Sequence, residues 1–254
     1  YMHRFKIHFP NEERAAGRPA MMRPAYEMQR GMGAVFGLNA GWEHPLWFAD
    51  APGTEDTNGF ARQNWFEPVG REAAMLRDAV GVIDISNFGK YEVTGPGAGD
   101  WLDALVANHV PREIGKSCLT PLIGMRGGVA GDFTITMTGD ESYMMIGSGM
   151  AERYHRRFFD MVPLPDGTGF EVATPRIAGF NVAGPRSREM LAGLTDADLS
   201  NEGWRFMRSR RIAVGGVDCL AIRVSFTGDL GWELHCAVDD LSLIHISEPT
   251  RPLY

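Results

Sequence analysis

Hydrophobic and polar residues alternate most clearly over residues 133–138, where Phe133, Ile135 and Met137 are separated by threonines. A period of two predicts a β-strand with one buried face. Short apolar runs predict further strands, and apolar residues at helical spacing predict helices between them. The predicted helices are 71–80, 99–107, 151–161 and 187–194, and the predicted strands are 90–93, 133–137, 143–147, 179–182, 217–224 and 231–237. This mixture predicts an α+β fold in which helices flank mixed sheets.

A strand, a Gly-Pro turn and a helix follow one another twice along the chain. Gly95-Pro96 and Gly184-Pro185 each come after a predicted strand and before a predicted helix. The recurrence suggests an internal duplication. Residues 51–58 are polar and contain Pro and Gly, which predicts an exposed loop between an aromatic-rich N-terminal stretch and the rest of the chain.

Composition narrows the class of protein. With 254 residues and 44% hydrophobic positions, the chain can form one large domain or two smaller ones. A formal net charge of −7 argues against a nucleic-acid-binding surface, which needs clustered Lys and Arg. No apolar run has the length of a membrane-spanning helix, so no membrane association is predicted.

Cysteine and histidine patterns predict no metal site. Cys118, Cys219 and Cys236 form no CxxC motif, and we expect buried thiols in a reducing compartment. The N-terminal histidines match no metal-ligand spacing; they are His3, His8 and His44.

Two segments each place a carboxylate close to glycines. Residues 127–135, GGVAGDFTI, contain Asp132, and residues 225–234, SFTGDLGWEL, contain Glu233. Glycine lets the backbone approach a ligand closely, and a carboxylate accepts hydrogen bonds with both oxygens. The alternative interpretation is that both carboxylates cap turns.

These two segments, in this order, resemble the motifs of the folate-binding aminomethyltransferase family, which includes the glycine-cleavage T-protein and the C-terminal half of dimethylglycine and sarcosine dehydrogenases. The resemblance runs from about Arg71 to about Asp240 and includes residues 71–89 and 181–185. It implies an aminomethyltransferase-like folate-binding domain.

The resemblance also implies the site residues. Asp132 is the implied catalytic acid or base, facing N5 and N10 of tetrahydrofolate, and Glu233 is implied to hydrogen-bond the pterin ring. Leu119, Gly147 and Phe226 are the further implied cofactor-binding positions. Phe226 replaces a Tyr of the T-proteins, and Gly147 replaces an Asn that usually contacts the pterin, so hydrogen bonds from these two positions are in question.

The upstream residues resemble the small central domain that joins the flavin half to the folate half in dimethylglycine and sarcosine dehydrogenases. Residues 1–70 are dense in aromatic side chains, whereas flexible linkers are polar. We therefore expect a linker domain over 1–68 and a truncated folate-binding domain over 69–240. An FAD-containing domain upstream would oxidise an N-methyl amine such as dimethylglycine, and the folate part would receive the carbon as 5,10-methylenetetrahydrofolate.

Two alternatives remain. A free-standing aminomethyltransferase would take its carbon from a lipoyl carrier, and residues 1–70 argue against it. A non-catalytic folate-binding protein would keep Glu233 without Asp132, and the presence of both argues against that. The expected partners are folate, a small-molecule substrate and the upstream flavin domain. The expected location is the cytoplasm of a bacterium, or the mitochondrial matrix of a eukaryote.

The C-terminal residues do not continue the family pattern. LSLIHISEPTR at 241–251 contains the translation of a transposon-end sequencing adapter. We expect residues 241–254 to be a non-native tail that cuts the reading frame short. The alternative is a genuine strand and turn.

Overall fold

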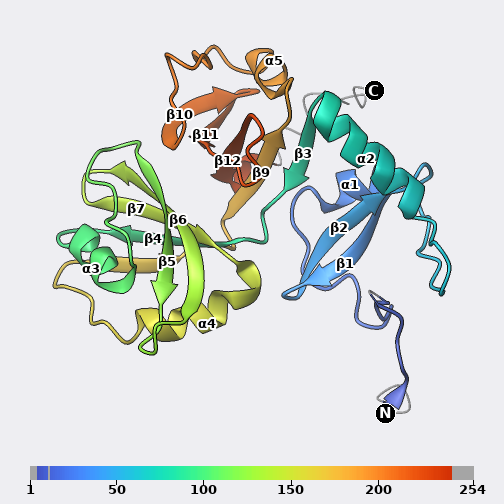
Figure 1. The fold of residues 1–254 in the computed structure, drawn as a ribbon, viewed down its shortest axis with the longest axis horizontal. Coiled ribbons are helices and arrows are strands. Elements are labelled where there is room, and N and C mark those ends of the chain that lie inside the picture. Colours follow the sequence, from blue (N-terminus) through green and yellow to red (C-terminus); the bar gives the residue numbers. More distant parts are fainter. Residues whose placement is uncertain (1–4, 11, 242–254) are drawn as a thin grey trace. The chain divides into compact units, whose positions relative to one another are not determined.

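The computed structural model describes residues 5–10 and 12–241 (Figure 1). The chain divides into two compact units, residues 1–77 and 78–254. The expected tail lies outside the described residues, apart from Leu241. Within the described part, no helix is long and apolar enough to cross a membrane.

The first unit has a small core around a β-hairpin. Its elements are α1 (Tyr26–Gly31), β1 (Ala34–Asn39), β2 (Trp42–Phe48) and α2 (Phe66–Asp78), whose last residue begins the second unit. Val35, Trp47 and Ala49 are buried, and Trp65 and Val69 pack against them. Trp47 and Trp65 of the aromatic-rich stretch therefore belong to a packed core, whereas Phe60 and Phe66 are exposed.

The second unit contains two five-stranded sheets. The first, here called the β12 sheet, has the order β10-β11-β12-β9-β3, and the second, the β6 sheet, has the order β5-β6-β7-β4-β8. The strands of the β12 sheet are β3 (Gly81–Asp84), β9 (Ile177–Ala183), β10 (Arg208–Val214), β11 (Val217–Arg223) and β12 (Gly231–Ala237). Those of the β6 sheet are β4 (Gly89–Thr94), β5 (Ser117–Ile123), β6 (Val129–Gly139), β7 (Ser142–Gly147) and β8 (Gly169–Val172).

All strand pairs of these two sheets are antiparallel in the described residues. The α+β prediction is confirmed, but the expected mixed sheets are not found. Parallel neighbours need a crossover of a dozen or more residues. The connections β5 to β6 to β7 and β10 to β11 are too short for that, so these strands form hairpins.

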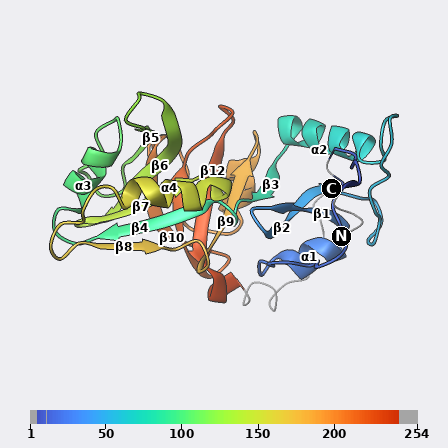
Figure 2. The ribbon, with the colours of Figure 1, turned by 90° about the horizontal axis from the view of Figure 1, so that it is seen from below.

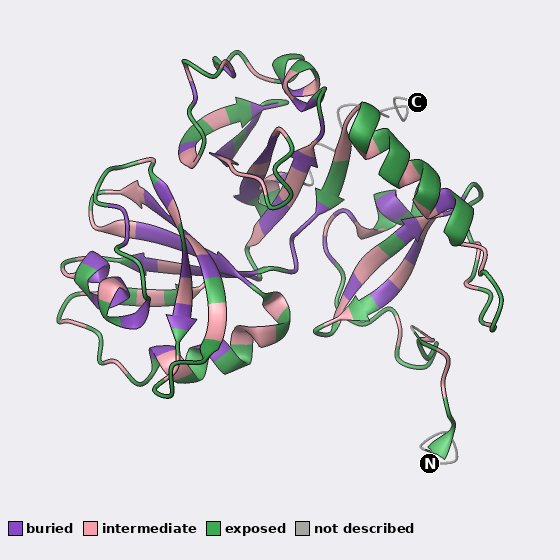
Figure 3. Cartoon of the chain, in the orientation of Figure 1, coloured by how far each residue is buried: buried purple, intermediate pink, exposed green. Residues whose placement is uncertain are grey.

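Helices α3 (Ala98–Leu105) and α4 (Glu152–Phe159) cover one face of the β6 sheet, as Figures 1 and 2 show. A short 3-10 helix, η2 (Gly149–Ala151), precedes α4. The core on this face joins Phe133 and Ile135 of β6 with Trp101 of α3 and Phe159 of α4. The buried residues run along the central strands in Figure 3. The predicted alternation over 133–137 therefore marks the face that meets the helices.

The opposite face of the β6 sheet meets the β12 sheet. Met144 and Ile146 of β7 form one buried cluster with Leu220 and Ile222 of β11. Thr136 is fully buried although it lies on the polar side of the alternation. Both faces of β6 are thus partly buried, because each has another layer against it.

The two predicted Gly-Pro units are present and alike. In the first, β4 leads through Gly95 into α3, and in the second, β9 leads through Gly184 into α5 (Ser187–Ala192). Both glycines have positive φ, +102° and +124°, which disfavours any residue with a side chain. Each carbonyl accepts the N–H three residues on, from Ala98 and from Ser187, at 3.1 Å. The shared geometry supports the predicted internal duplication.

Candidate functional site

Asp132 is the fourth residue of β6 and lies opposite Pro121 of β5. The hairpin turn before β6 closes through Gly124 and Gly127, and a Cβ at Gly127 or Gly128 would meet nothing within 4 Å. The Asp132 side chain is exposed and makes no hydrogen bond or ion pair within the described residues. It therefore does not cap the turn, which excludes that interpretation for this carboxylate.

Glu233 is the third residue of β12, between Asn181 of β9 and Ile222 of β11. Its side chain is 20% exposed, and Oε2 lies 3.3 Å from Nε2 of His235. The carboxylate bonds a neighbour on its own strand, so it does not cap a turn either.

The strand registers place both carboxylates on the surfaces through which the two sheets face each other. Glu233 pairs with Ile222, which belongs to the buried cluster between the sheets. Asp132 lies two residues from Thr134, and Thr134 pairs with Ile146 of the same cluster. Because side chains two residues apart on a strand share a face, Asp132 lies on the inner face of its sheet.

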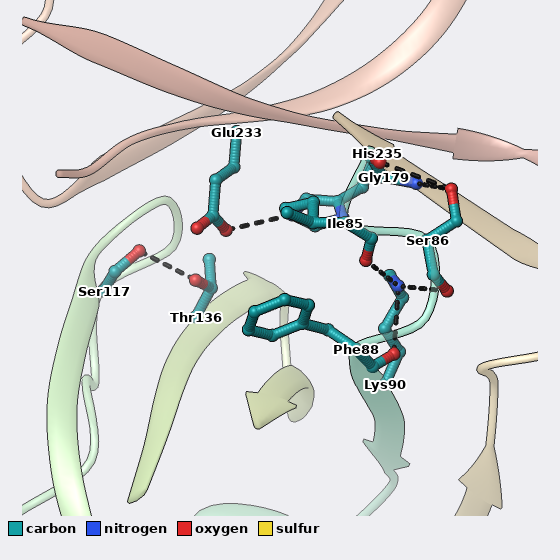
Figure 4. Close-up of polar contacts among 9 residues, drawn as sticks. All are labelled: Ile85, Ser86, Phe88, Lys90, Ser117, Thr136, Gly179, Glu233 and His235. Atoms are coloured by element: carbon teal, nitrogen blue, oxygen red, sulfur yellow. Dashed lines mark hydrogen bonds and ion pairs between the residues drawn. The ribbon is translucent and has the colours of Figure 1, made fainter. Parts of the chain in front are cut away.

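Figure 4 shows this inner region, with Glu233 on β12 and Thr136 on β6. The hydroxyls of Ser117 and Thr136 share a 2.7 Å hydrogen bond there. Further along the same inner faces, a cavity of about 170 Å³ is lined by Met144 of one sheet and by Leu220 and His235 of the other. The inner surfaces thus combine polar groups with apolar walls.

A fully buried lysine lies at the turn that links the two sheets. Lys90 of β4 donates from Nζ to the carbonyls of Ile85, Ser86 and Phe88, at 3.1 to 3.2 Å (Figure 4). A buried ammonium is costly unless it is hydrogen-bonded, and these carbonyls supply acceptors. Ser86 also bonds Gly179 of β9, which ties the turn to the β12 sheet. Lys90 therefore fixes the connection beneath the Glu233 region.

The backbone beside Asp132 packs against a buried histidine. A Cβ at Gly131 would lie 2.5 Å from Nε2 of His155, a residue of α4 that is 1% exposed. Nδ1 of His155 lies 3.2 Å from the Tyr91 hydroxyl. Burial lowers the pKa of His155, although the nearby Asp132 carboxylate acts in the opposite direction. Only glycine fits at residue 131, so His155 defines the backbone path that presents Asp132.

The other predicted cofactor-binding positions are distributed over both sheets. Leu119 of β5 pairs with Thr134 and is 60% exposed, on the same face as Asp132. Phe226 is fully exposed in the connection between β11 and β12. Gly147 lies opposite Phe133, so a side chain there would be directed at that ring and into the core beneath the helices.

His235, Lys90 and His155 were not predicted from the sequence. A signal did exist for His235, because it stands two residues after Glu233 on a predicted strand and so shares its face. Lys90 and His155 carry no such signal, since only the folded chain buries them. Within the described residues, no group of three or more His, Cys, Asp or Glu side chains could hold a metal ion.

Comparison with known proteins identifies the family. The family model described as the GCVT N-terminal domain matches residues 25–245, which begin inside the first unit and include most of the second. Mitochondrial dimethylglycine dehydrogenase of Mus musculus is 33% identical over 243 residues, covering 94% of this chain and 28% of that protein. Human mitochondrial sarcosine dehydrogenase is 28% identical, covering 92% of this chain and 30% of that protein.

Aminomethyltransferases match as well. The enzyme of Saccharopolyspora erythraea is 28% identical, covering 85% of this chain and 54% of its own length. The crystal structure of glycine cleavage system aminomethyltransferase T from Bartonella henselae matches with a TM-score of 0.70 at 21% identity, covering 89% of this chain and 56% of that one. The structural match establishes the fold. The chain spans only about 28% of the length of the mouse dimethylglycine dehydrogenase.

Proposed function

The chain belongs to the family of the GCVT N-terminal domain, and from this premise we propose that it binds tetrahydrofolate between its two sheets and transfers a one-carbon unit to it. One observation carries the proposal: the carboxylates of Asp132 and Glu233, about a hundred residues apart in the sequence, lie on the two surfaces that face each other.

The residues on these surfaces fit a reduced pterin. A pterin ring has a polar edge with adjacent N–H donors, and Glu233 presents a partly exposed carboxylate that accepts such donors. Exposed apolar side chains, Leu119 on the inner face of its sheet and Phe88 in the linking turn, suit the ring faces. Glu233 would therefore orient the ring.

Tetrahydrofolate supplies the two nitrogens that receive the carbon. Asp132 would hold or release a proton at these nitrogens and stabilise positive charge that develops there. Its exposure and its lack of a hydrogen-bond partner within the described residues leave both oxygens available for this role. His155, packed against Gly131, would keep the carboxylate in place.

We extend the proposal to a longer protein in which this chain is the folate-binding part. Residues 1–68 would be the linker domain and 69–240 the folate-binding domain. A flavin domain that lies outside the printed sequence would oxidise an N-methyl amine such as dimethylglycine or sarcosine and deliver the carbon. The support is the similarity to dimethylglycine and sarcosine dehydrogenases over more than nine tenths of this chain.

A free-standing aminomethyltransferase is the second candidate. The match to the Saccharopolyspora erythraea enzyme favours it. The two candidates differ in the carbon donor: a lipoyl carrier would support the transferase, and a methylated amine together with a flavin domain would support the dehydrogenase. Activity with each donor, measured on the longer protein, separates them.

Folate binding is the primary test. Titration calorimetry with 5-formyltetrahydrofolate should show binding, and Glu233→Gln should weaken it about 10- to 100-fold, because a charge-assisted hydrogen bond contributes roughly 1.5–3 kcal/mol. Glu171→Gln is the matched control, since Glu171 is an exposed strand carboxylate paired with Arg176. No binding by the parent, or equal affinity for the Glu233 variant, would overturn the proposal.

A further inference from the structure

His235 and Glu233 lie two residues apart on β12, so their side chains share the face that meets the β6 sheet. Nε2 of His235 lies 3.3 Å from Oε2 of Glu233 (Figure 4). The histidine side chain is 1% exposed, whereas the glutamate is 20% exposed. The buried ring therefore lies behind the carboxylate, and the carboxylate lies nearer to solvent.

The direction of this hydrogen bond follows from its surroundings. An ionised carboxylate only accepts, so Nε2 must carry the hydrogen. Nδ1 is buried and has no hydrogen-bond partner within the described residues, and a Cβ at Gly179 would lie 3.0 Å from it. A hydrogen on Nδ1 would be buried without an acceptor, which is costly. The ring is thus the neutral tautomer with its hydrogen on Nε2.

Electrostatics favour the same neutral form. Burial lowers the pKa of His235, and the Lys90 ammonium acts in the same direction, while Glu233 opposes both. Lys90 is itself held by three backbone carbonyls of the linking turn, so this charge has a fixed place. His235 is therefore a neutral donor in a rigid setting.

We propose that His235 is a positioning residue for folate recognition: it donates from Nε2 to Oε2 of Glu233, holds that carboxylate in one rotamer, and leaves Oε1 for the adjacent N–H donors of a pterin edge. The inference rests on the proposed function. A glutamate rotamer that is fixed before the ligand arrives would reduce the conformational entropy lost on binding. Oε1 makes no hydrogen bond within the part of the chain described by the structure.

The test is a double-mutant cycle with a rescue variant. His235→Leu fills the space without a donor, and His235→Gln keeps a donor close to the position of Nε2. We expect the Leu variant to bind 5-formyltetrahydrofolate about 3- to 10-fold more weakly, as loss of one hydrogen bond implies. The Gln variant should stay within about 2-fold of the parent. In a Glu233→Gln background, His235→Leu should change the affinity little.

The matched control is His109→Leu, because the His109 side chain is fully exposed and lies 3.9 Å from Asp103. If the parent binds no folate, the proposed function itself fails. If the parent binds and Glu233→Gln weakens binding, but His235→Leu has no effect or has the same effect in both backgrounds, only the positioning role fails.

A second measurement uses the parent protein and does not depend on whether any variant folds. Histidine ring ¹⁵N shifts report which nitrogen carries the hydrogen. We expect a neutral ring with the hydrogen on Nε2 for His235 at pH 7. A hydrogen on Nδ1 instead would overturn the proposal.

Discussion

Gly147 lies directly opposite Phe133 in the register of β6 and β7, and a Cβ atom at residue 147 would lie 2.6 Å from the Phe133 ring. The same Cβ would lie 3.1 Å from the carbonyl oxygen of Asp132. A side chain at 147 would therefore displace the strand that presents Asp132.

Gly147→Asn, which restores the residue that the resemblance leads us to expect, should destabilise the protein by about 1–3 kcal/mol through overpacking. Urea unfolding measures the change. Gly128→Asn is the control, because a Cβ there would meet nothing within 4 Å. Equal stability of the two variants would show that Phe133 can move aside freely.

Asp132→Asn should separate one-carbon transfer from folate binding. Asparagine is nearly isosteric but neither carries charge nor takes up a proton. In the proposed longer protein, formation of 5,10-methylenetetrahydrofolate should fall about 10²- to 10⁴-fold, the usual contribution of general acid/base catalysis. Amine oxidation, followed by flavin reduction in the same sample, should stay at the parent rate while released formaldehyde rises.

The control for this variant is Asp140→Asn, at the exposed tip of the β6–β7 hairpin. It should leave both rates unchanged. A parallel fall of flavin reduction and folate product in Asp132→Asn would contradict a role specific to transfer, and an unchanged folate product would remove Asp132 from the reaction.

The stability of the protein should fall as the pH drops below about 6.5, the ordinary pKa of histidine. Burial lowers the pKa of His155 and of His235. Both rings therefore stay neutral in the folded state at pH values at which the same two residues are already protonated in the unfolded chain. The free energy of unfolding then decreases until the pH reaches the lowered pKa values. Urea unfolding at pH 7.5, 6.5 and 5.5 measures this slope.

His155→Gln should reduce the slope because it removes one of these two rings with a lowered pKa, whereas His109→Gln should not, since that side chain is fully exposed. The carboxylates whose pKa is lowered by ion pairs or backbone N–H groups titrate at lower pH and contribute little in this window. A free energy of unfolding that does not change between pH 5.5 and 7.5 would contradict a lowered pKa for either ring.

Removal of residues 242–254 should change the free energy of unfolding by no more than about ±0.5 kcal/mol, as for surface changes in general. The reason is the expected adapter origin of these residues, which would give them no evolved packing partner. The deletion should begin after Leu241, because that side chain is only 5% exposed. Loss of cooperative unfolding in the shortened chain would show that these residues pack.

Local features of this protein could be predicted because they depend on neighbours in the sequence. The alternation of Phe133, Ile135 and Met137 predicts the strand and its face toward the helices. The two Gly-Pro units, at Gly95 and Gly184, also follow from the sequence, because a left-handed backbone conformation favours glycine wherever it occurs. The family motifs singled out both carboxylates without showing that they lie on facing surfaces.

The strands that the pattern did not predict are those whose stability comes from pairing. Several are short or highly polar, such as β8 (Gly169–Val172) and the arginine-rich edge strand β10 (Arg208–Val214). Cross-strand hydrogen bonds stabilise both segments: β8 pairs with β4, which is distant in the sequence, and β10 forms a hairpin with β11. Local residue preferences do not indicate such pairing.

Only the tertiary structure brought Asp132 and Glu233 to facing surfaces. The facing of these two surfaces depends on the packing of Met144 and Ile146 against Leu220 and Ile222, a contact between strands more than seventy residues apart. The same packing buries Thr136, Lys90 and His235. In a single sheet with this face open to solvent, all three side chains would be in water. Burial is a property of the assembled layers, so the groups that hold the site in place could not be recognised before the two sheets were seen together.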